Sequence, residues 1–477
     1  MIQDDGIVST GAGTHSPQPL QVTAKSQKRA GGPPNIKLSI GEQKAKCPAP
    51  AWTAFLGTSK ERLRCSLVGE AKSKVRCVRL PLVSRRIQSG LLVVNCDLDL
   101  EEFAALLKSL RIIKNMLTRI YIDNFRSFLN FEYRPERKQL LLGPNGSGKS
   151  SLLEAFRYLK LFIKGDSNKF TQSTRTRWQD RPLQVIEIEA NLDGKPFEYR
   201  VEIGFAAVTK EQSVNLERLK VSGATVFELA DGQIRFFPND SSSMAVPLQT
   251  NRSALHLSLL SNSDVRCFVE WLDRVHCFDI DAYPGTMDEV ADSEEREPDF
   301  ELDNLAGWYR YLVQTHPEEN VKFLASLKQC MEGFQALKFS SEEDGVRKLR
   351  AEFQAPTKKR VSYSISELSE GQRCLIALYM ILHFLINRGD TVFLDEPDNF
   401  ISLREIQPWL LEAEEAVEEH GGQLILISHH PETLNQWARE YGLQFFREGN
   451  GHVRAEKFRS DQDGKLQPSE LIARGWE

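Results

Sequence analysis

A glycine-rich segment, Gly143 to Ser150, constrains the fold of this chain more than any other feature. It reads Gly-Pro-Asn-Gly-Ser-Gly-Lys-Ser, the complete spacing of a phosphate-binding loop. The apolar run Gln139–Leu142 before it predicts a buried strand, and Ser151–Phe156 after it predicts the start of a helix. Because glycines let backbone N–H groups turn inward and a helix N-terminus attracts anions, this strand–loop–helix unit predicts a nucleoside triphosphate site.

Each side chain of the loop has an expected role. Lys149 is expected to reach the β- and γ-phosphates of ATP, and the Ser150 hydroxyl to ligate Mg²⁺. The alternative is a glycine-rich turn that binds nothing, which the register of strand, loop and helix disfavours. The residues expected to bind nucleotide here are Gly143, Pro144, Asn145, Gly146, Ser147, Gly148, Lys149, Ser150 and Ser151.

A second apolar run begins at Asp390 and ends in two adjacent acids, Asp395 and Glu396. The position of Asp395 at a strand end predicts a ligand of Mg²⁺, directly or through water. Glu396 is predicted to polarise the water that attacks the γ-phosphate. Two acids can also form an ordinary turn, but their place downstream of a phosphate loop favours hydrolysis.

Two further motifs flank this strand. Before it, Leu368–Arg373 reads Leu-Ser-Glu-Gly-Gln-Arg, and Ser369 is a suitable N-cap for the apolar helix that follows. After it, the apolar run Leu424–Ser428 ends in His429 and His430. Taken alone, the first motif is a capped helix and the second is a strand followed by a structural histidine.

Taken together and in this order, the four motifs resemble those of the ABC-like AAA ATPases grouped with RecF, the SMC proteins and the OLD-type ATPases. The resemblance covers roughly Leu117 to Lys457. It implies an α/β fold, a P-loop NTPase with an ABC-type ATPase core. It also implies that Ser369 and Gly371 contact the γ-phosphate held by a second copy of the chain, and that His429 is a catalytic switch histidine.

The segment Thr118–Phe128 also resembles this family, in which an Asn-Phe-Arg-Ser sequence follows the first strand and lies near the nucleotide. The resemblance therefore implies that Arg126 contacts the nucleotide. The glutamine loop of the family is not clear in this sequence. Gln172 and Gln179 are the two candidates, and the choice between them stays open.

The first 115 residues differ in composition from the rest of the chain. They hold 18 Lys and Arg against 9 Asp and Glu, a balance of +9; since the whole chain carries −5, residues 116–477 carry −14. Residues 1–90 show no sustained helical or strand period, and their composition is typical of disorder. The next methionine after Met1 is Met116. Three interpretations are open: an over-extended reading frame with Met116 as the true start, which we favour, a disordered extension, and a targeting peptide.

Residues 116–477 are expected to form one ATPase domain with an inserted β and helical subdomain at about 183–340. Leu183–Phe237 alternates apolar and polar residues, with turns at Asp193-Gly194 and Asp231-Gly232, which predicts antiparallel strands. Ser263–His276 and Phe300–Gly333 have helical spacing. The sequence has no sustained heptads, so the coiled-coil arms of SMC proteins are not expected.

After His430 the sequence continues for 47 residues, with a predicted helix at Glu432–Tyr441 and a hairpin around Glu448–Gly451. This length is too short for the nuclease domain that follows the ATPase in OLD-type enzymes. No apolar run reaches membrane-spanning length, so no membrane insertion is expected. The cysteines have no metal-binding spacing, and a reducing cytoplasm is the expected location.

These observations predict an enzyme that hydrolyses ATP in an ATP-dependent head-to-tail homodimer. The resemblance implies a switch in DNA repair or phage defence that acts with a partner effector, for which a nuclease or DNA is the candidate. The balance of −14 argues against broad phosphate-backbone binding, although Lys358–Arg360 and residues 164–177 form local basic strips. The alternatives are the energising subunit of a membrane transporter and a scaffold that binds nucleotide without hydrolysing it.

Overall fold

The computed structural model describes residues 115–475, except for 167–168, 207–211, 238–243, 248–250, 256–261, 281, 284–285, 342–346 and 460–465, together with the backbone of five short strands before residue 96. The chain divides into two units, Met1–Ser109 and Leu110–Glu477. Each unit is described by itself.

The first unit contains two small sheets. One has the order β2-β1-β5 and the other is a β3–β4 hairpin. The strands are β1 (Gln21–Gln27), β2 (Asn35–Gly41), β3 (Thr53–Ser59), β4 (Arg62–Val68) and β5 (Val93–Asn95). The interpretation of residues 1–115 as a disordered or over-extended leader stays a prediction.

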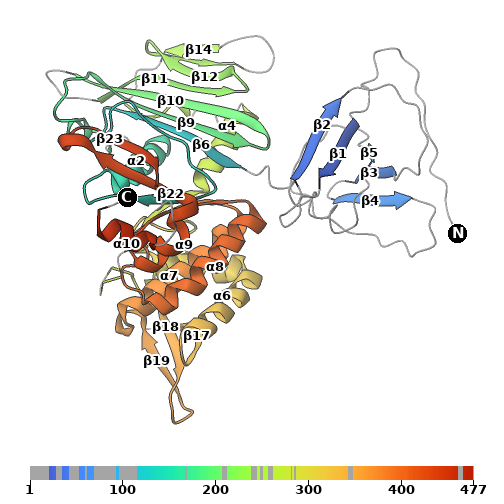
Figure 1. The fold of residues 1–477 in the computed structure, drawn as a ribbon, viewed down its shortest axis with the longest axis vertical. Coiled ribbons are helices and arrows are strands. Elements are labelled where there is room, and N and C mark those ends of the chain that lie inside the picture. Colours follow the sequence, from blue (N-terminus) through green and yellow to red (C-terminus); the bar gives the residue numbers. More distant parts are fainter. Residues whose placement is uncertain are drawn as a thin grey trace. The chain divides into compact units, whose positions relative to one another are not determined.

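The second unit contains a six-stranded sheet with the order β15-β20-β21-β8-β22-β23, of which Figure 1 labels β22 and β23. Strands β15 to β22 of this order are parallel, and β23 is antiparallel at the edge. Strands β8, β20 and β21 are buried at every position, which explains their continuous apolar runs. The strands are β8 (Lys138–Leu142), β15 (Val275–Asp279), β20 (Thr391–Asp395), β21 (Gln423–Ile427), β22 (Gly442–Arg447) and β23 (Val453–Lys457).

The second large sheet is antiparallel and has the order β14-β13-β12-β11-β10-β9-β6-β7. The predicted alternation between Leu183 and Phe237 is confirmed. The turns at Asp193-Gly194 and Asp231-Gly232 have positive φ at both residues, as two-residue hairpins require. The strands are β6 (Met116–Asp123), β7 (Phe131–Tyr133), β9 (Leu183–Leu192), β10 (Lys195–Phe205), β11 (Gln212–Val221), β12 (Ala224–Ala230), β13 (Gln233–Phe236) and β14 (Met244–Pro247).

The parallel sheet separates two hydrophobic cores. Alternate residues of β8 point to opposite faces, so Leu140 and Leu142 pack in the core of α7, α8 and α9, while Leu141 packs in the core of α2 and the antiparallel sheet. Figure 1 shows these layers above and below the sheet. The helices are α2 (Lys149–Ile163), α4 (Ser263–Asp273), α5 (Leu305–Thr315), α6 (Pro317–Cys330), α7 (Glu370–Phe384), α8 (Leu403–His420), α9 (Pro431–Tyr441) and α10 (Pro468–Ala473).

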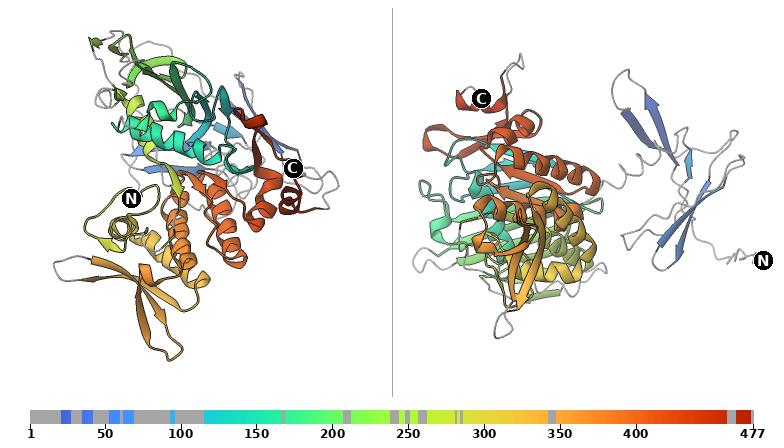
Figure 2. Two further views of the ribbon diagram at one scale, coloured as in Figure 1. Left: turned by 90° about the vertical axis from the view of Figure 1, so that its left-hand side faces the viewer. Right: turned by 90° about the horizontal axis from the view of Figure 1, so that it is seen from below.

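A third, smaller sheet consists of β16 (Val290–Ala291), β17 (Phe334–Ser341), β18 (Arg347–Gln354) and β19 (Arg360–Ser364). Figure 2 shows that β17, β18 and β19 project from the helices around α6 and α7. These strands were not predicted from the sequence. The basic strip Lys358–Arg360 lies at the tip between β18 and β19, where its side chains are exposed.

One predicted helix is wrong at its end. The helical pattern was expected to continue from Ser263 to His276, but α4 ends at Asp273 and Val275–Asp279 forms β15. This strand pairs in parallel with β20, so a segment inside the expected insertion belongs to the core sheet. The tertiary pairing with β20 outweighs the short apolar periodicity that favoured a helix. The predicted helix at Glu432–Tyr441 and the following hairpin are confirmed.

Candidate functional site

The carboxyl ends of three parallel strands bring the predicted motifs together. Strand β21 lies between β20 and β8, so Asp395 is in register with Ile427, and Ile427 with Leu141. The loops that follow these strands are the phosphate-binding loop, the Asp395-Glu396 pair and the Ser428–His430 segment. Ligands of open parallel sheets bind at this edge.

The glycines of the phosphate-binding loop are required by its conformation. Gly143, Gly146 and Gly148 have φ values of 133°, 78° and 107°. A Cβ atom at Gly143 would lie 2.1 Å from the carbonyl oxygen of Phe445, and one at Gly148 would lie 2.6 Å from Cγ2 of Val453. Both contacts are impossible for a larger residue, so the loop is held tightly against the β22–β23 hairpin.

Lys149 is the first residue of α2 and is 6% exposed. Its Nζ donates hydrogen bonds to the carbonyl oxygens of Gly143 at 2.6 Å and Pro144 at 3.3 Å. Burial lowers the pKa of this ammonium group, and the carboxylates of Asp395 and Glu396 oppose that shift. The N-cap Gly148 has no side-chain cap, so the first-turn N–H groups of α2 can bind an anion.

Asp395 ends β20 and is 7% exposed. Burial, with Asp279 and Glu396 nearby, raises its pKa to about 6, while the hydroxyl of Ser150 opposes the shift. Its Oδ1 is buried without a hydrogen-bond partner among the described residues. Buried oxygens are normally satisfied, and hard carboxylate and hydroxyl oxygens are what Mg²⁺ binds, so Asp395 and Ser150 fit a Mg²⁺ ion.

Glu396 lies next to Asp395 with φ of 43°, a strained conformation for a residue with a side chain. Its N–H donates to the carbonyl oxygen of Ile427 at 2.8 Å, and its Oε2 accepts a hydrogen bond from Asn399 at 2.7 Å. Nε2 of His429 lies 3.7 Å from Oε1 of Glu396. This carboxylate is oriented and half-buried, as a group that polarises water needs to be.

The histidine segment is supported by a network that the sequence did not reveal. Asp398 is buried, and its Oδ2 accepts hydrogen bonds from the hydroxyls of Ser428 at 2.6 Å and Thr433 at 2.5 Å. The hydroxyl of Ser428 accepts a hydrogen bond from the backbone N–H of His430 at 2.9 Å. Asp398 therefore fixes the loop that carries His429. Burial lowers the pKa of His429, as does the charge of Lys149.

Arg126 has φ of 48° in the loop between β6 and β7, and its side chain forms an ion pair with Glu154 of α2. The same loop lies against the phosphate-binding loop, because Oγ of Ser127 and the Phe128 ring are 3.5 Å from the position of a Cβ at Gly148. Arg126 is thus close in the fold to the predicted site, although its guanidinium is held by α2.

The segment with both glutamine candidates also approaches this region. The carbonyl oxygen of Thr174 accepts a hydrogen bond from the N–H of Arg126 at 2.7 Å. Gln172 is half-buried beside Thr174, whereas Gln179 is exposed and accepts a hydrogen bond from Arg181. The geometry selects neither as the glutamine loop.

A missed residue, Arg447, links this segment to the phosphate-binding loop. Its guanidinium donates to the carbonyl oxygen of Gly146 at 3.3 Å and lies 5.4 Å from the ring centre of Trp178. Arg447 is the last residue of β22 and has no motif around it, so the sequence carried no signal for this contact.

The structure does not bring the signature motif to the phosphate-binding loop of the same chain. Ser369 is the exposed N-cap of α7, and it forms a reciprocal capping box with Gln372. Gly371 packs against the carbonyl oxygen of Phe400, which lies 2.9 Å from the position of a Cβ. No hydrogen bond or ion pair within the described ranges joins Ser369 or Gly371 to residues 143–150.

Comparisons with known proteins give one family. A family model described as "AAA domain, putative AbiEii toxin, Type IV TA system" matches residues 140–435, more than half of the chain. No curated protein matches the chain. In the part of the chain that the structure describes, no helix is long and apolar enough to cross a membrane.

Several solved structures are similar to the chain at low identity. The SMC head domain from Thermotoga maritima has 14% identity and a TM-score of 0.39, over 72% of this chain and 99% of that one. An SMC head bound to the C-winged helix domain of ScpA has 13% identity and a TM-score of 0.43, over 72% and 98%. An Smc head with an extended coiled coil bound to the C-terminal domain of ScpA, derived from Pyrococcus furiosus, has 11% identity and a TM-score of 0.43, over 72% and 97%.

Proposed function

Since the chain belongs to the family described as "AAA domain, putative AbiEii toxin, Type IV TA system" and is an ABC-like AAA ATPase, we propose that ATP closes it into a head-to-tail homodimer and that hydrolysis reopens the dimer. One observation carries this proposal. Lys149, Asp395, Glu396 and His429 converge at one edge of the sheet, while Ser369 is exposed and has no bond to that edge.

The residues of the phosphate-binding loop would bind the triphosphate. The N–H groups at the start of α2 and Nζ of Lys149 supply positive charge to the β- and γ-phosphates. Ser150 and Asp395 would hold Mg²⁺. When bound, Mg²⁺ neutralises phosphate charge and favours departure of the γ-phosphoryl group. Arg126 is proposed as a further nucleotide contact, because its loop packs on Gly148.

Glu396 would accept the proton of the attacking water, since it is the half-exposed carboxylate beside Asp395 and Asn399 fixes its orientation. His429 lies on the other side of the same carboxylate. It would stabilise charge that develops on the γ-phosphate in the transition state. Asp398 binds the hydroxyls of Ser428 and Thr433 and so holds the loop that carries His429, which makes it a positioning residue.

The head-to-tail arrangement follows from where the signature motif lies. A hydroxyl at the N-terminus of α7, beside the N–H groups of its first turn, is suited to a phosphate. The phosphate-binding loop of the same chain does not reach it. In a symmetric dimer, Ser369 and Gly371 of one copy would complete the site of the other, and each dimer would contain two such sites.

The dimer is proposed to act as a switch for a partner effector in phage defence, with DNA repair as the second setting. The family description supports defence, because it names a toxin of a toxin–antitoxin system. The partner is proposed to be a nuclease or DNA. The charge of −14 on residues 116–477 favours a protein partner over broad DNA binding.

The experiment that tests shared sites uses Ser369→Arg mixed with Lys149→Ala. Each mixed dimer has one site with both defects and one site with neither, so a 1:1 mixture should recover up to about a quarter of the wild-type ATPase rate. Each variant alone should be nearly inactive.

The matched control is Asn262→Arg, which also replaces a helix N-cap by arginine but lies on α4. It should lose about 1 kcal/mol of stability and keep its ATPase activity. A mixture no more active than its two components, or full activity of Ser369→Arg alone, would contradict sites shared between chains.

A further inference from the structure

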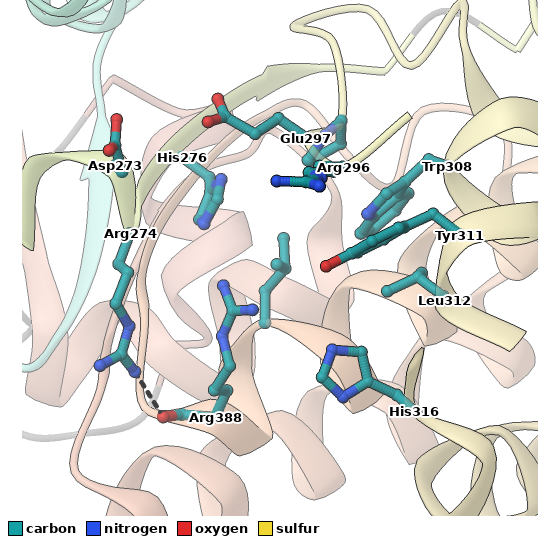
Figure 3. A pocket seen from close by; sticks show the side chains of 12 residues that line it. Asp273, Arg274, His276, Arg296, Glu297, Trp308, Tyr311, Leu312, His316 and Arg388 are labelled. Atoms are coloured by element: carbon teal, nitrogen blue, oxygen red, sulfur yellow. Dashed lines mark hydrogen bonds between the residues drawn. The ribbon is translucent and has the colours of Figure 1, made fainter. Parts of the chain in front are cut away.

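A pocket of about 160 Å³ lies at the opposite, amino end of the parallel sheet. Its floor is the start of β15 and the turn before β20, and its cover comes from α5 and the segment before it (Figure 3). Strand β20 has five residues, which span roughly 13 Å at 3.3 Å per step. The pocket is therefore separate from the candidate ATP site, and nothing in the proposed mechanism uses it.

One side of the pocket is apolar and aromatic. Trp308, Tyr311 and Leu312 come from α5. Leu385, the C-cap of α7, also lines the pocket. The indole of Trp308 is buried, so it is held rigidly in this wall. The hydroxyl of Tyr311 points into the pocket (Figure 3). Such a wall suits a flat apolar body.

The other side carries positive charge. The guanidinium groups of Arg296 and Arg388 point toward the pocket centre in Figure 3. Arg388 uses Nε and Nη2 to bind Asp390, and its Nη1 has no partner among the described residues. Arg296 is exposed, and no hydrogen bond or ion pair engages it within the same ranges. Two guanidinium groups thus have donors available for one ligand.

The acids in the lining do not cancel this charge. Asp273 and Glu297 point away from the centre in Figure 3, and both form ion pairs with Lys164. Arg274 also points away and donates to the carbonyl oxygen of Arg388 at 2.7 Å. Asp390 does not line the pocket and is shared by Arg274, Arg388 and His276, which do. Arg296 is therefore the one charge of the lining with no counterion in the described residues.

We propose that this pocket binds a small organic anion, a carboxylate or phosphate on a flat apolar body, with Arg296 and Arg388 on the anionic group and Trp308 and Tyr311 on the body. Guanidinium groups match the oxygens of both anions through paired hydrogen bonds. An apolar cavity of roughly 150 Å³ takes up benzene, so the volume here fits one ring of that size.

The test is isothermal titration of the full-length chain with benzoate, phenyl phosphate, inorganic phosphate and the neutral benzamide. Excess Mg-ADP is present throughout to occupy the phosphate-binding loop. Benzoate or phenyl phosphate should bind with a Kd of about 0.1–1 mM, and benzamide and inorganic phosphate at least about tenfold more weakly. The benzoate and phenyl phosphate titrations distinguish a carboxylate ligand from a phosphate ligand.

Arg296→Gln should weaken the better ligand at least about tenfold, because it removes a charged hydrogen bond without disturbing any contact of the fold. Tyr311→Phe should weaken it about twofold to tenfold. The matched control, Arg404→Gln, removes an exposed arginine from α8 and should leave binding unchanged. Equal binding of benzoate and benzamide, unchanged binding in Arg296→Gln, or no binding of either anionic ring compound would overturn the proposal.

Discussion

The two ends of the parallel sheet belong to the same strands, but they differ in whether their buried polar groups have hydrogen-bond partners. At the carboxyl end, polar groups are left without partners: Oδ1 of Asp395 and Oγ of Ser147 are buried and unbonded in the described structure. At the amino end, Asp390 is buried at the start of β20 and is bound by Arg274, Arg388 and His276. Strand β20 separates the two aspartates, yet only Asp390 has a hydrogen-bond partner for each carboxylate oxygen.

The pKa values of the two aspartates show the consequence. Burial raises the pKa of Asp395 to about 6, and the few groups around it do not reverse this. Burial acts on Asp390 in the same direction, but hydrogen bonds from His276 and Arg388 outweigh it and hold its pKa below the usual range. An ionised Asp390 therefore stabilises the fold, whereas an ionised Asp395 opposes it.

Gln423 is a second buried polar residue at the amino end whose side chain has hydrogen-bond partners. It is fully buried at the start of β21, and its side chain bonds to both N and O of Leu117 in β6 at 2.7 and 2.9 Å. It thereby joins the parallel sheet to the antiparallel sheet. The amino end is thus built for stability. The carboxyl end keeps strained and unpaired groups, as sites that bind charged ligands do.

The largest predicted effect is the difference in ATPase rate between alanine variants of two lysines, Lys149 in the phosphate-binding loop and Lys138 at the start of the strand before it. Lys149→Ala should lower the ATPase rate on the order of 10³-fold, because it removes the charge beside the phosphates. Lys138→Ala, at the amino end of β8, removes ion pairs with Glu414 and Glu418. It should keep the ATPase activity and lose about 1–3 kcal/mol of stability.

Phosphate release and thermal unfolding of the two lysine variants measure these effects. The contrast between the ends would be wrong if Lys138→Ala lost activity while folded, or if Lys149→Ala hydrolysed ATP at the wild-type rate.

Glu396→Gln should slow hydrolysis about 10²- to 10³-fold while ATP still binds, because glutamine keeps the shape but cannot accept a proton. If ATP closes the dimer, this variant should accumulate as a dimer on size-exclusion chromatography with Mg-ATP. Glu432→Gln makes the same change on the first turn of α9 and should behave as wild type. A monomer with bound ATP would reject ATP-driven closure while leaving the role of Glu396 intact.

Asp390→Asn should lower the stability of the fold and leave the ATPase rate nearly unchanged. It breaks a buried ion-pair network and should cost about 3–5 kcal/mol of stability, with the ATPase rate of the folded protein within about twofold of wild type. Asp395→Asn should do the reverse, with hydrolysis lost and stability unchanged or higher in the absence of metal. Urea denaturation and phosphate release on both variants test the pair; equal stability loss would show that the two ends do not differ.

The carboxyl end was largely predictable from the sequence, because each of its motifs is local. Gly143–Ser150, Asp395-Glu396 and His429 each follow an apolar run, and the carboxyl ends of parallel strands share one edge. Their convergence is confirmed by the register of β20, β21 and β8. The roles of the individual residues stay predictions.

The amino end was not predictable, because its partners are far apart in sequence. Asp390 is bonded by Arg274 across 116 residues, and Gln423 by Leu117 across 306. The sequence around a buried polar residue at the start of a strand has no spacing pattern from which its hydrogen-bond partner could be predicted. Strand β15 was missed for the same reason: only its pairing with β20 distinguishes Val275–Asp279 from the end of a helix.

The smallest predicted effect is on the stability of the fold at acidic pH. Burial lowers the pKa of His276 to about 4, although its hydrogen bond to Asp390 opposes the shift. The unfolded chain, in which histidine titrates near 6.5, binds the proton more strongly. This residue therefore costs no stability above about pH 6.5 and removes stability as the pH falls toward 4.

His276→Gln keeps a donor for Asp390 but does not titrate. Its stability should match wild type within about 1 kcal/mol at pH 8, and should exceed it by roughly 2 kcal/mol at pH 4.5. Urea denaturation at both pH values measures the difference. Parallel stability curves for the two proteins between pH 6.5 and 4.5 would show that His276 is not held neutral, and that acid acts on the amino end through Asp390 alone.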